Sequence, residues 1–423
     1  MKKIKLIIPL LLFCIFMISL TSISAIDLNN SDNTDPNDIN MHINDKKIKT
    51  ETNTPKTITL TNKNFNQYVT NGEFNEEVSD GDTIDVDGMF DSDKFSLNVN
   101  KSLNFISSKN NSYINLYTQS TVDYGEATGG QITFGHGASG SNITNLYFYN
   151  TRVTFTNVSN VNVNNISVID YEAVIGSGTG HFIIGGQSDN VTIANSYFYT
   201  KDNGQHSTAV FSGCSNILFE NNTIIGVGGL GNLVYLNTFN VEEGASHSNF
   251  IIRNNVIDAS QAESQITCFA ICLTGSNILI DNNTIDYKGY NICPIYGGQG
   301  VLENITIQNN NLKTVILGNL GIIEVKYINN TKITNNTIST LIVSKSEESN
   351  HKAEIYNNTI GGLILGADDC IVEENTLKSI NNTGKNNIIN NNTISNMGNY
   401  TITTTVENTT ITNKCDKQFS SPL

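Results

Sequence analysis

Tryptophan is absent from this sequence of 423 residues, and arginine occurs only at Arg152 and Arg253. Charged residues make up 15% of the chain, and the formal net charge is −15. A chain with so little positive charge offers no basic patch for phosphate groups, which excludes nucleic acid and anionic membrane surfaces as expected partners. The scarcity of charged helix formers also disfavours a helical bundle.

The most frequent residues of the sequence are asparagine, threonine, isoleucine, serine and glycine. These are strand and turn formers, so the composition predicts an all-β protein. Disorder is excluded from about residue 56 onward, because isoleucine, valine, leucine and phenylalanine recur at regular intervals. A neutral to mildly acidic surface of this kind suits solubility outside the cell and favours neutral glycans or cations over anions.

The N-terminus has the pattern of a secretory signal peptide. Residues 1–5 contain three lysines, residues 6–20 are almost wholly apolar, and residues 22–25 are small or polar. This order predicts a signal peptide over residues 1–25, with cleavage near Ala25. The alternative is an uncleaved anchor, since residues 6–25 are just long enough to span a bilayer. No later segment is apolar enough to do so, and we expect a secreted or cell-surface protein.

The remainder divides into four segments. Residues 26–55 are polar without an apolar period and predict a flexible leader. Residues 56–140 predict an N-terminal cap and the first coils, with a short helix within 64–70 and strands at 57–60, 83–86, 97–99, 103–106 and 113–117. Residues 141–415 predict a repeat domain, and residues 416–423 form a tail.

The repeat is an apolar residue, any residue, asparagine, two further residues and a second apolar residue, as in Ile143-x-Asn145-x-x-Phe148. Successive units lie 17 to 33 residues apart, with Glu374 replacing the asparagine once and Ile411-x-Asn413 forming a last half-unit. A short fixed motif at variable spacing predicts a β-solenoid, in which the corners stack and the loops vary. No six-residue period is present, so we expect a right-handed parallel β-helix. Two steps of 17 residues are short for three strands per coil.

The asparagine of the motif has a predicted structural role. Asparagine tolerates the left-handed conformation that a sharp corner needs. Stacked on successive coils, its amide can bond to the neighbouring coil and form a ladder. The predicted ladder consists of Asn145, Asn165, Asn195, Asn221, Asn254, Asn282, Asn309, Asn335, Asn357 and Asn391.

With these repeats the chain resembles the pectate-lyase-like β-helix superfamily, and more closely the adhesin-like surface proteins of methanogenic archaea. Residues 81–90 (GDTIDVDGMF), 97–107 (LNVNKSLNFIS), 196–200 (SYFYT) and 231–236 (GNLVYL) carry the resemblance, which covers roughly residues 60–400. It implies a secreted or wall-associated protein with an adhesive role. Many members of that family end in an attachment module, whereas this sequence ends at Leu423 without one.

Two classes of function stay open. The first is a non-catalytic adhesin that presents a rigid rod to glycans or cell-surface proteins. The second is a polysaccharide lyase or glycoside hydrolase on the same scaffold, which needs a base beside acids or paired carboxylates. The fragments Gly135-His-Gly137 and Asp368-Asp369 resemble parts of a polygalacturonase site but occur in the wrong order. Arg253 lies in a repeat corner and is expected to face solvent. The first class is therefore favoured, with no catalytic residue and no cofactor assigned.

Polar residues of the longest coils form a possible ligand groove, because loops on one flank of a β-helix can build one. The tyrosines at 147, 149, 197 and 199 alternate with core phenylalanines, so we expect them to face outward, where aromatic faces stack on sugar rings. The candidate groove residues are Asp170, Glu172, His181, Asp202, His206, Glu242, Glu243 and His247.

Three further features are expected to be structural or unassigned. The aspartates of residues 80–93 lack the spaced ligands of a calcium loop, so no metal site is assigned. The cysteines after residue 25 fit no zinc spacing, and buried thiols are expected. Asn-x-Ser/Thr sequons are abundant. Those at the ladder positions are expected to be engaged in the stack and not glycosylated, whereas those away from the corners are open to glycosylation.

Overall fold

The computed structural model divides the chain into two compact units, Met1–Thr52 and Asn53–Leu423. The described residues all belong to the second unit. They are 54–91, 96–109, 112–115, 131–170, 182–202, 208–228, 231–237, 247–261, 266–271, 275–287, 293–297, 301–317, 327–344, 352–394, 402–404 and 410–415.

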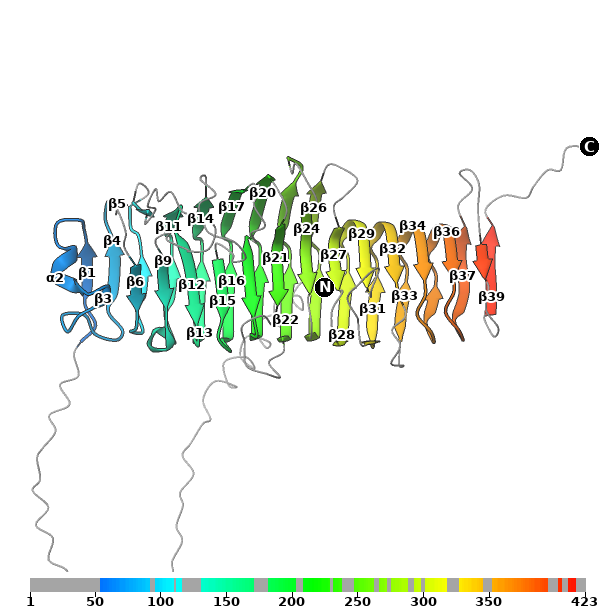
Figure 1. The fold of residues 1–423 in the computed structure, drawn as a ribbon, viewed down its shortest axis with the longest axis horizontal. Coiled ribbons are helices and arrows are strands. Elements are labelled where there is room, and N and C mark those ends of the chain that lie inside the picture. The colour runs from blue at the N-terminus through cyan, green and yellow to red at the C-terminus, as the bar shows by residue number, and fades with distance from the viewer. Residues whose placement is uncertain are drawn as a thin grey trace, which may run out of the picture. The chain divides into compact units, whose positions relative to one another are not determined.

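Strands of the second unit wind in parallel through three sheets, which we name S1, S2 and S3 (Figure 1). Each strand pairs with the strand one coil later: β12 with β15, β13 with β16, and β14 with β17. Each coil bonds only to its neighbours, about 4.8 Å away. The predicted right-handed parallel β-helix is confirmed.

Sheet S1 contains the first half of every repeat motif. Its strands are β1(Thr57–Leu60), β4(Thr83–Val86), β7(Asn104–Ile106), β10(Asn142–Thr144), β13(Ser159–Asn164), β16(Asp189–Ala194), β19(Ser215–Glu220), β22(His247–Arg253), β25(Gly275–Asp281), β28(Val301–Gln308), β30(Tyr327–Asn329), β31(Thr331–Thr334), β33(Ala353–Tyr356), β35(Ile371–Glu373), β37(Ile388–Ile394) and β39(Thr410–Cys415).

Sheets S2 and S3 complete each coil. The strands of S2 are β5(Met89–Asp91), β8(Tyr113–Asn115), β11(Tyr147–Tyr149), β14(Ser167–Asp170), β17(Tyr197–Asp202), β20(Thr223–Gly228), β23(Val256–Ala259) and β26(Thr284–Tyr287). The strands of S3 are β3(Glu73–Phe74), β6(Ser96–Val99), β9(Gln131–Phe134), β12(Arg152–Thr156), β15(Phe182–Gly185), β18(Ala209–Ser212), β21(Gly231–Asn237), β24(Ile266–Ile271), β27(Cys293–Gly297) and β38(Ile402–Thr404).

Toward the C-terminus, S2 and S3 fuse. The strand β29(Asn311–Leu317) pairs with β26 through Asn311 and with β27 through Val315. The strands β32(Thr337–Val343), β34(Thr359–Leu365) and β36(Thr376–Asn382) continue this arrangement. A coil without a loop between S2 and S3 needs fewer residues, which explains the 17-residue steps.

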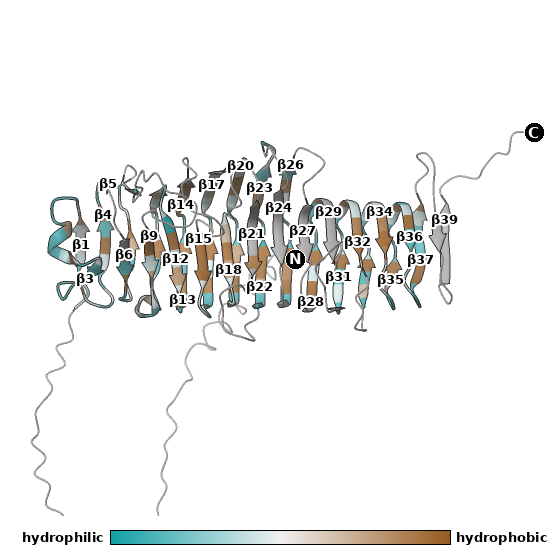
Figure 2. Ribbon diagram, viewed as in Figure 1, coloured by the Kyte–Doolittle hydropathy of each residue, from teal (hydrophilic) through white to brown (hydrophobic). Residues whose placement is uncertain are grey.

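The core is built by alternation along each strand (Figure 2). The predicted first apolar column is in register, as in Ile252, Ile280 and Ile307, each with an exposed fraction of 0%. In the N-terminal half the core is aromatic, where rings follow one another at centroid distances of 4.7–6.3 Å. This series is Phe74, Phe105, Phe134, Phe155, Phe182, Phe198, Phe219, Phe211 and Phe250.

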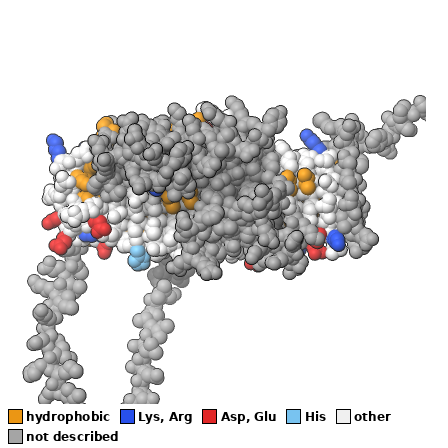
Figure 3. Space-filling model, in the orientation of Figure 1, with side chains coloured by type: hydrophobic (Ala, Val, Ile, Leu, Met, Phe, Trp, Pro, Cys, Tyr) orange, Lys and Arg blue, Asp and Glu red, His pale blue; other side chains and the backbone are white. Residues whose placement is uncertain are grey.

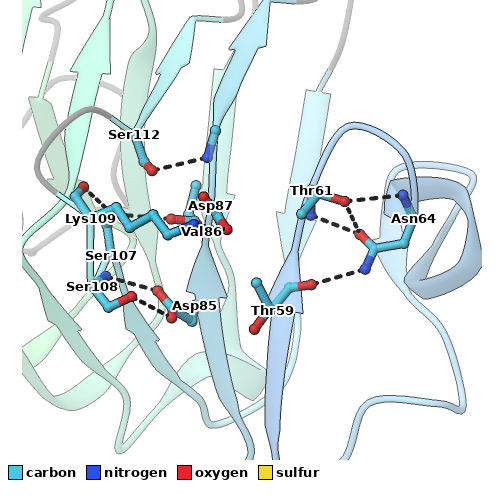
Figure 4. Close-up of polar contacts among 11 residues, drawn as sticks. Thr59, Thr61, Asn64, Asp85, Val86, Asp87, Ser107, Ser108, Lys109 and Ser112 are labelled. Atoms are coloured by element: carbon cyan, nitrogen blue, oxygen red, sulfur yellow. Dashed lines mark hydrogen bonds and ion pairs between the residues drawn. The ribbon is translucent and has the colours of Figure 1, made fainter.

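The N-terminal coils begin with the predicted short helix, here α2(Phe65–Tyr68), followed by β2(Val69–Thr70), which forms an antiparallel hairpin with β3. Asn64 fixes the approach to the helix: its Oδ1 accepts from the backbone N–H of Thr61 at 2.7 Å, and its Nδ2 donates to the carbonyl oxygen of Thr59 at 2.9 Å (Figure 4). A single 3₁₀ turn, His136–Ala138, precedes β10.

Candidate functional site

The corner between S1 and S2 has the backbone conformation that the motif predicts. All of the predicted ladder asparagines have φ between 50° and 58°. An L-residue other than glycine rarely adopts this left-handed conformation, and asparagine tolerates it best. The first asparagine of the motif therefore makes the corner.

The side chains of these asparagines are exposed. Hydrogen bonds join some of them along the coils: Asn165 Nδ2 donates to Asn145 Oδ1 at 2.7 Å, and Asn282 Nδ2 to Asn254 Oδ1 at 2.8 Å. Elsewhere the partner changes, since Asn309 Nδ2 donates to Asp281 Oδ1 at 2.7 Å. The predicted column thus lies at the surface and is only partly joined through its own amides.

A second, buried column lies one residue later in the chain. Asn255 shows the pattern: its Nδ2 donates to the carbonyl oxygen of Phe219 at 3.1 Å, and its Oδ1 accepts from the backbone N–H of Asn222 at 2.9 Å. Each buried amide therefore joins successive coils where their backbones turn. The column consists of Asn222, Asn255, Asn283, Asn310, Asn336, Asn358, Asn375 and Asn392, each at most 2% exposed.

The repeat motif does not predict this buried column, although the sequence contains a signal for it. The first coils have Leu146 and Ile166 at the same position, both 1% exposed, and then Ser196. The early units have an apolar residue at the position where later units have asparagine. This exchange indicates that the position faces the core. The first asparagine of the motif is the more regular signal, because it is present in every early unit, but its side chain points outward.

A third column of asparagines, which the motif does not predict either, marks the corner between S3 and S1. These residues also have positive φ and exposed side chains. Nδ2–Oδ1 hydrogen bonds of 2.9–3.3 Å connect Asn330, Asn304, Asn277, Asn249 and Asn216 in turn. Both edges of S1 are therefore lined with exposed amides.

Of the predicted groove residues, the structure describes the side chain of His247 alone. His247 is corrected outright: it has an exposed fraction of 0%, and its ring packs edge-on against Phe250 at 5.3 Å. It begins β22 in register with buried Gly275 and lies two residues before the corner residue Asn249, at a position that faces the core. Asp170 and Asp202 end the S2 strands β14 and β17, where they pair in register with Thr200 and Gly228 of the next coil. The remaining groove residues, Glu172, His181, His206, Glu242 and Glu243, lie outside the described residues.

The predicted outward tyrosines lie on S2, on two coils that are separated by the coil of β14. Tyr147 and Tyr149 alternate with buried Phe148, as Tyr197 and Tyr199 do with buried Phe198, and the tyrosines are half-buried. The expectation that they face outward is confirmed. With Tyr113 they make up what we name the tyrosine face, on strands β8, β11 and β17.

The register orders the tyrosine face into two columns. Tyr147 and Tyr197 flank Ser167 in one column, two coils apart, which is about 10 Å. In the other, Tyr149 and Tyr199 flank Ile169, which points outward yet is only 9% exposed. Each column therefore consists of two half-buried tyrosines with one residue between them, which is Ser167 in the first column and Ile169 in the second.

Neighbouring contacts stabilise this surface. Tyr113 meets Tyr149 edge to face, with ring centroids 5.2 Å apart and an interplanar angle of 78°. Such pairs contribute roughly 0.5–1.5 kcal/mol beyond area burial. Arg152 begins β12 three residues after Tyr149, and burial lowers the pKa of its guanidinium group. Ordered rings of this kind lose little entropy when a ligand binds.

Two carboxylates that the structure describes are hydrogen-bonded within the chain. On S1, Glu220 Oε2 accepts from Arg253 Nε at 2.7 Å, which confirms the partly exposed position predicted for Arg253. Asp368 Oδ1 accepts from the backbone N–H of Lys385 at 2.7 Å. His136 lies ahead of β10, many coils from Asp368, so the fragments that resemble a hydrolase do not meet.

Aspartates of the N-terminal coils also form hydrogen bonds and ion pairs within the fold (Figure 4). Asp85 accepts from the backbone N–H of Ser108 at 2.8 Å and from its hydroxyl at 2.7 Å, and Asp87 pairs with Lys109. Figure 3 shows acidic side chains gathered at this end of the visible face. Within the described ranges, no cluster of histidine, cysteine and acidic side chains could hold a metal ion, and no helix could cross a bilayer.

No family model matches this sequence, and no curated protein shows significant similarity to it. Among solved structures, the surface adhesin PfbA of Streptococcus pneumoniae is 16% identical, with 75% of this chain and 81% of that chain covered and a TM-score of 0.37. The catalytic domain of a GH87 α-1,3-glucanase, solved with nigerose, is 14% identical, with 85% and 68% covered and a TM-score of 0.40. The chain is a β-helix protein, and these similarities are too distant to indicate an activity.

Proposed function

We propose that this chain is an exported, non-catalytic binding protein of the adhesin type, whose rigid rod presents the tyrosine face to neutral glycans. The observation that carries the proposal is the pair of tyrosine columns on S2. Their half-buried rings are fixed by the strand register, and the column that holds Tyr147 and Tyr197 continues on the next coils through Thr223, Val256 and Thr284. Export rests on the signal-peptide pattern of residues 1–25.

The chemistry of the face suits a neutral sugar. A pyranose ring presents C–H groups on one side, which pack on an aromatic ring, and hydroxyls at its edge, which bond to a phenol. The net charge of −15 repels acidic polysaccharides at a distance. Tyr147 and Tyr197, about two coil rises apart, can each stack on one sugar of an extended chain that runs along the rod axis.

A direct test measures binding of the purified full chain to a panel of neutral and acidic polysaccharides. The double variant Tyr147→Ser/Tyr197→Ser is expected to bind a neutral ligand roughly 10- to 100-fold more weakly, since each lost stacking contact is worth about 1 kcal/mol. The variant Tyr147→Phe/Tyr197→Phe retains the rings and should lose less than the serine variant.

The matched control is Tyr356→Ser, which removes a partly exposed tyrosine from S1 rather than S2. It should leave affinity unchanged, and thermal melting should show that all of the variants fold. Release of oligosaccharides from any bound polymer would instead support the lyase or hydrolase alternative. Equal binding by the wild type and the serine double variant would remove the tyrosine face from the proposal.

A further inference from the structure

Whether an asparagine begins an Asn-x-Ser/Thr sequon is related in this fold to whether its side chain is exposed or buried. Every asparagine of an Asn-x-Ser/Thr sequence whose exposure the structure describes is exposed: Asn100, Asn142, Asn157, Asn165, Asn190, Asn221, Asn282, Asn304, Asn335, Asn357, Asn381 and Asn391. The buried asparagines begin no such sequence. They are Asn222, Asn255, Asn283, Asn310, Asn336, Asn358, Asn375, Asn382, Asn387 and Asn392.

Strand alternation explains this separation. Residues two apart point to the same side of a strand, so a serine or threonine two residues after an inward asparagine would also have to lie in the core. Core positions are taken by isoleucine or leucine, as in Asn336-Thr-Ile338. In each of the sequons named above, both the asparagine and the hydroxyl residue two positions later lie outside the core.

The geometry for attaching a sugar to an asparagine amide is most favourable at Asn335 and Asn357, on successive coils of the corner between S1 and S2. Their φ angles are 56° and 52°, and both side chains are exposed. The hydroxyl residues Thr337 and Thr359 are exposed as well and lie in register. Asn357 Nδ2 donates to Asn335 Oδ1 at 2.7 Å, and this bond uses one of the two hydrogens of the donor amide.

We infer that this corner is an acceptor for N-linked sugar and that Asn335 and Asn357 are alternative attachment sites. The donor is an activated glycosyl phosphate and the transferase belongs to the exporting cell. The Nδ2–C1 bond forms as the C1–O bond breaks, the phosphate leaves with the bonding electrons, and one amide hydrogen is lost as a proton. The carbonyl oxygen and the second hydrogen remain, so the bond along the column persists.

The two sites exclude each other because their coils are about 4.8 Å apart. An oligosaccharide is broader than this spacing, so a sugar on one asparagine covers the other. Asn282 and Asn391 are separated from this pair by a coil whose corner residue, Asn309 or Glu374, begins no sequon, so they are not in competition with it. The inference rests on the export of the chain, which belongs to the proposed function.

The experiment is peptide mass spectrometry on the chain purified from the envelope and medium of the cells that naturally produce it. Sugar is expected on peptides containing Asn335 and Asn357, with fractional occupancies that together do not exceed one. The variant Thr337→Val removes one sequon with a side chain of the same shape at an exposed position. It should abolish sugar at Asn335 and raise the occupancy at Asn357.

Three outcomes would overturn the inference. Exported chain without sugar at either residue contradicts the acceptor site while leaving glycan binding by the unmodified rod intact. Full occupancy of both asparagines in the same molecules, or no rise at Asn357 in the Thr337→Val variant, contradicts their exclusion. Absence of the chain from envelope and medium contradicts export, and with it both proposals.

Discussion

The side-chain oxygen of Asn310 accepts two hydrogen bonds from Asn283 on the preceding coil, from its backbone N–H at 2.8 Å and from its Nδ2 at 3.1 Å. Both residues are 2% exposed, so no solvent replaces these partners. The same relationship recurs between Asn255 and Asn283 and between Asn310 and Asn336. The buried column thus supplies hydrogen bonds that the turning backbone cannot make for itself.

Replacing one member of the buried column should destabilise the rod strongly. In Asn283→Leu the N–H of Asn255 loses its acceptor and the carbonyl oxygen of Ile252 loses its donor. Two buried unsatisfied groups at roughly 1–3 kcal/mol each lower the free energy of unfolding by about 2–6 kcal/mol. Chemical denaturation measures this, with Thr284→Val as an exposed control in the same turn. A loss below about 0.5 kcal/mol, the usual range for a surface change, would show that the column contributes no net stability.

At the exposed corner asparagines, the stability of a variant should depend on whether the new residue tolerates the left-handed backbone conformation, and not on the loss of the side-chain amide. At Asn335, with φ of 56°, glycine adopts the same conformation without strain, whereas alanine does so at a cost of roughly 1–2 kcal/mol. We therefore expect Asn335→Gly to have almost the stability of the wild type and Asn335→Ala to be less stable. Thermal unfolding of the pair decides this, and an equal loss in both variants would mean that the amide is the stabilising group.

Among the carboxylates of the N-terminal coils, Asp82 should contribute most to the stability of the folded protein. It is 1% exposed and accepts from the backbone N–H groups of Lys56 at 2.9 Å and Ser79 at 2.8 Å. Asp82→Ala leaves both donors unsatisfied and is expected to cost about 2–4 kcal/mol. Hydrogen exchange should be faster at Lys56 and Ser79. The control is Asp80→Ala, since Asp80 is an exposed carboxylate that bonds only to the N–H of Ser102 among the described contacts. Equal losses in both variants would contradict the role of burial.

The buried thiols should be unreactive in the folded protein. Burial raises the pKa of Cys214 and of Cys370 to about 12. Iodoacetamide at pH 8 should therefore label them only after unfolding. Because an unfolded thiol ionises at a lower pH than these folded ones, the free energy of unfolding should fall as pH rises from about 9 toward 12, by up to about 1.4 kcal/mol per pH unit for each thiol. Rapid labelling of the native chain at pH 8, followed by mass spectrometry, would contradict the burial of these side chains.

The architecture could be predicted from sequence because its cause is local and repeats. Apolar residues two before and three after an asparagine lie inside only if the chain bends between them, and the units stack in register as expected. The short helix at Phe65–Tyr68 and the strands before it and after it follow from the same local patterns. The outward direction of Tyr147 and Tyr197 also follows, because strand alternation alone decides it.

Contacts between coils decided the rest. Which asparagine of an Asn-Asn pair is buried depends on how the corner turns, and His247 is buried at the position where the adjacent coil has Gly275. The fusion of S2 and S3 in β29 is likewise visible only in the pairing with β26 and β27. By itself the sequence determined a right-handed stack of coils with asparagine corners, since periodicity and left-handed propensity act within a few residues. Only the tertiary structure decided which amides are buried and which side chains share a face, because those depend on neighbours one coil away, up to 38 residues along the chain.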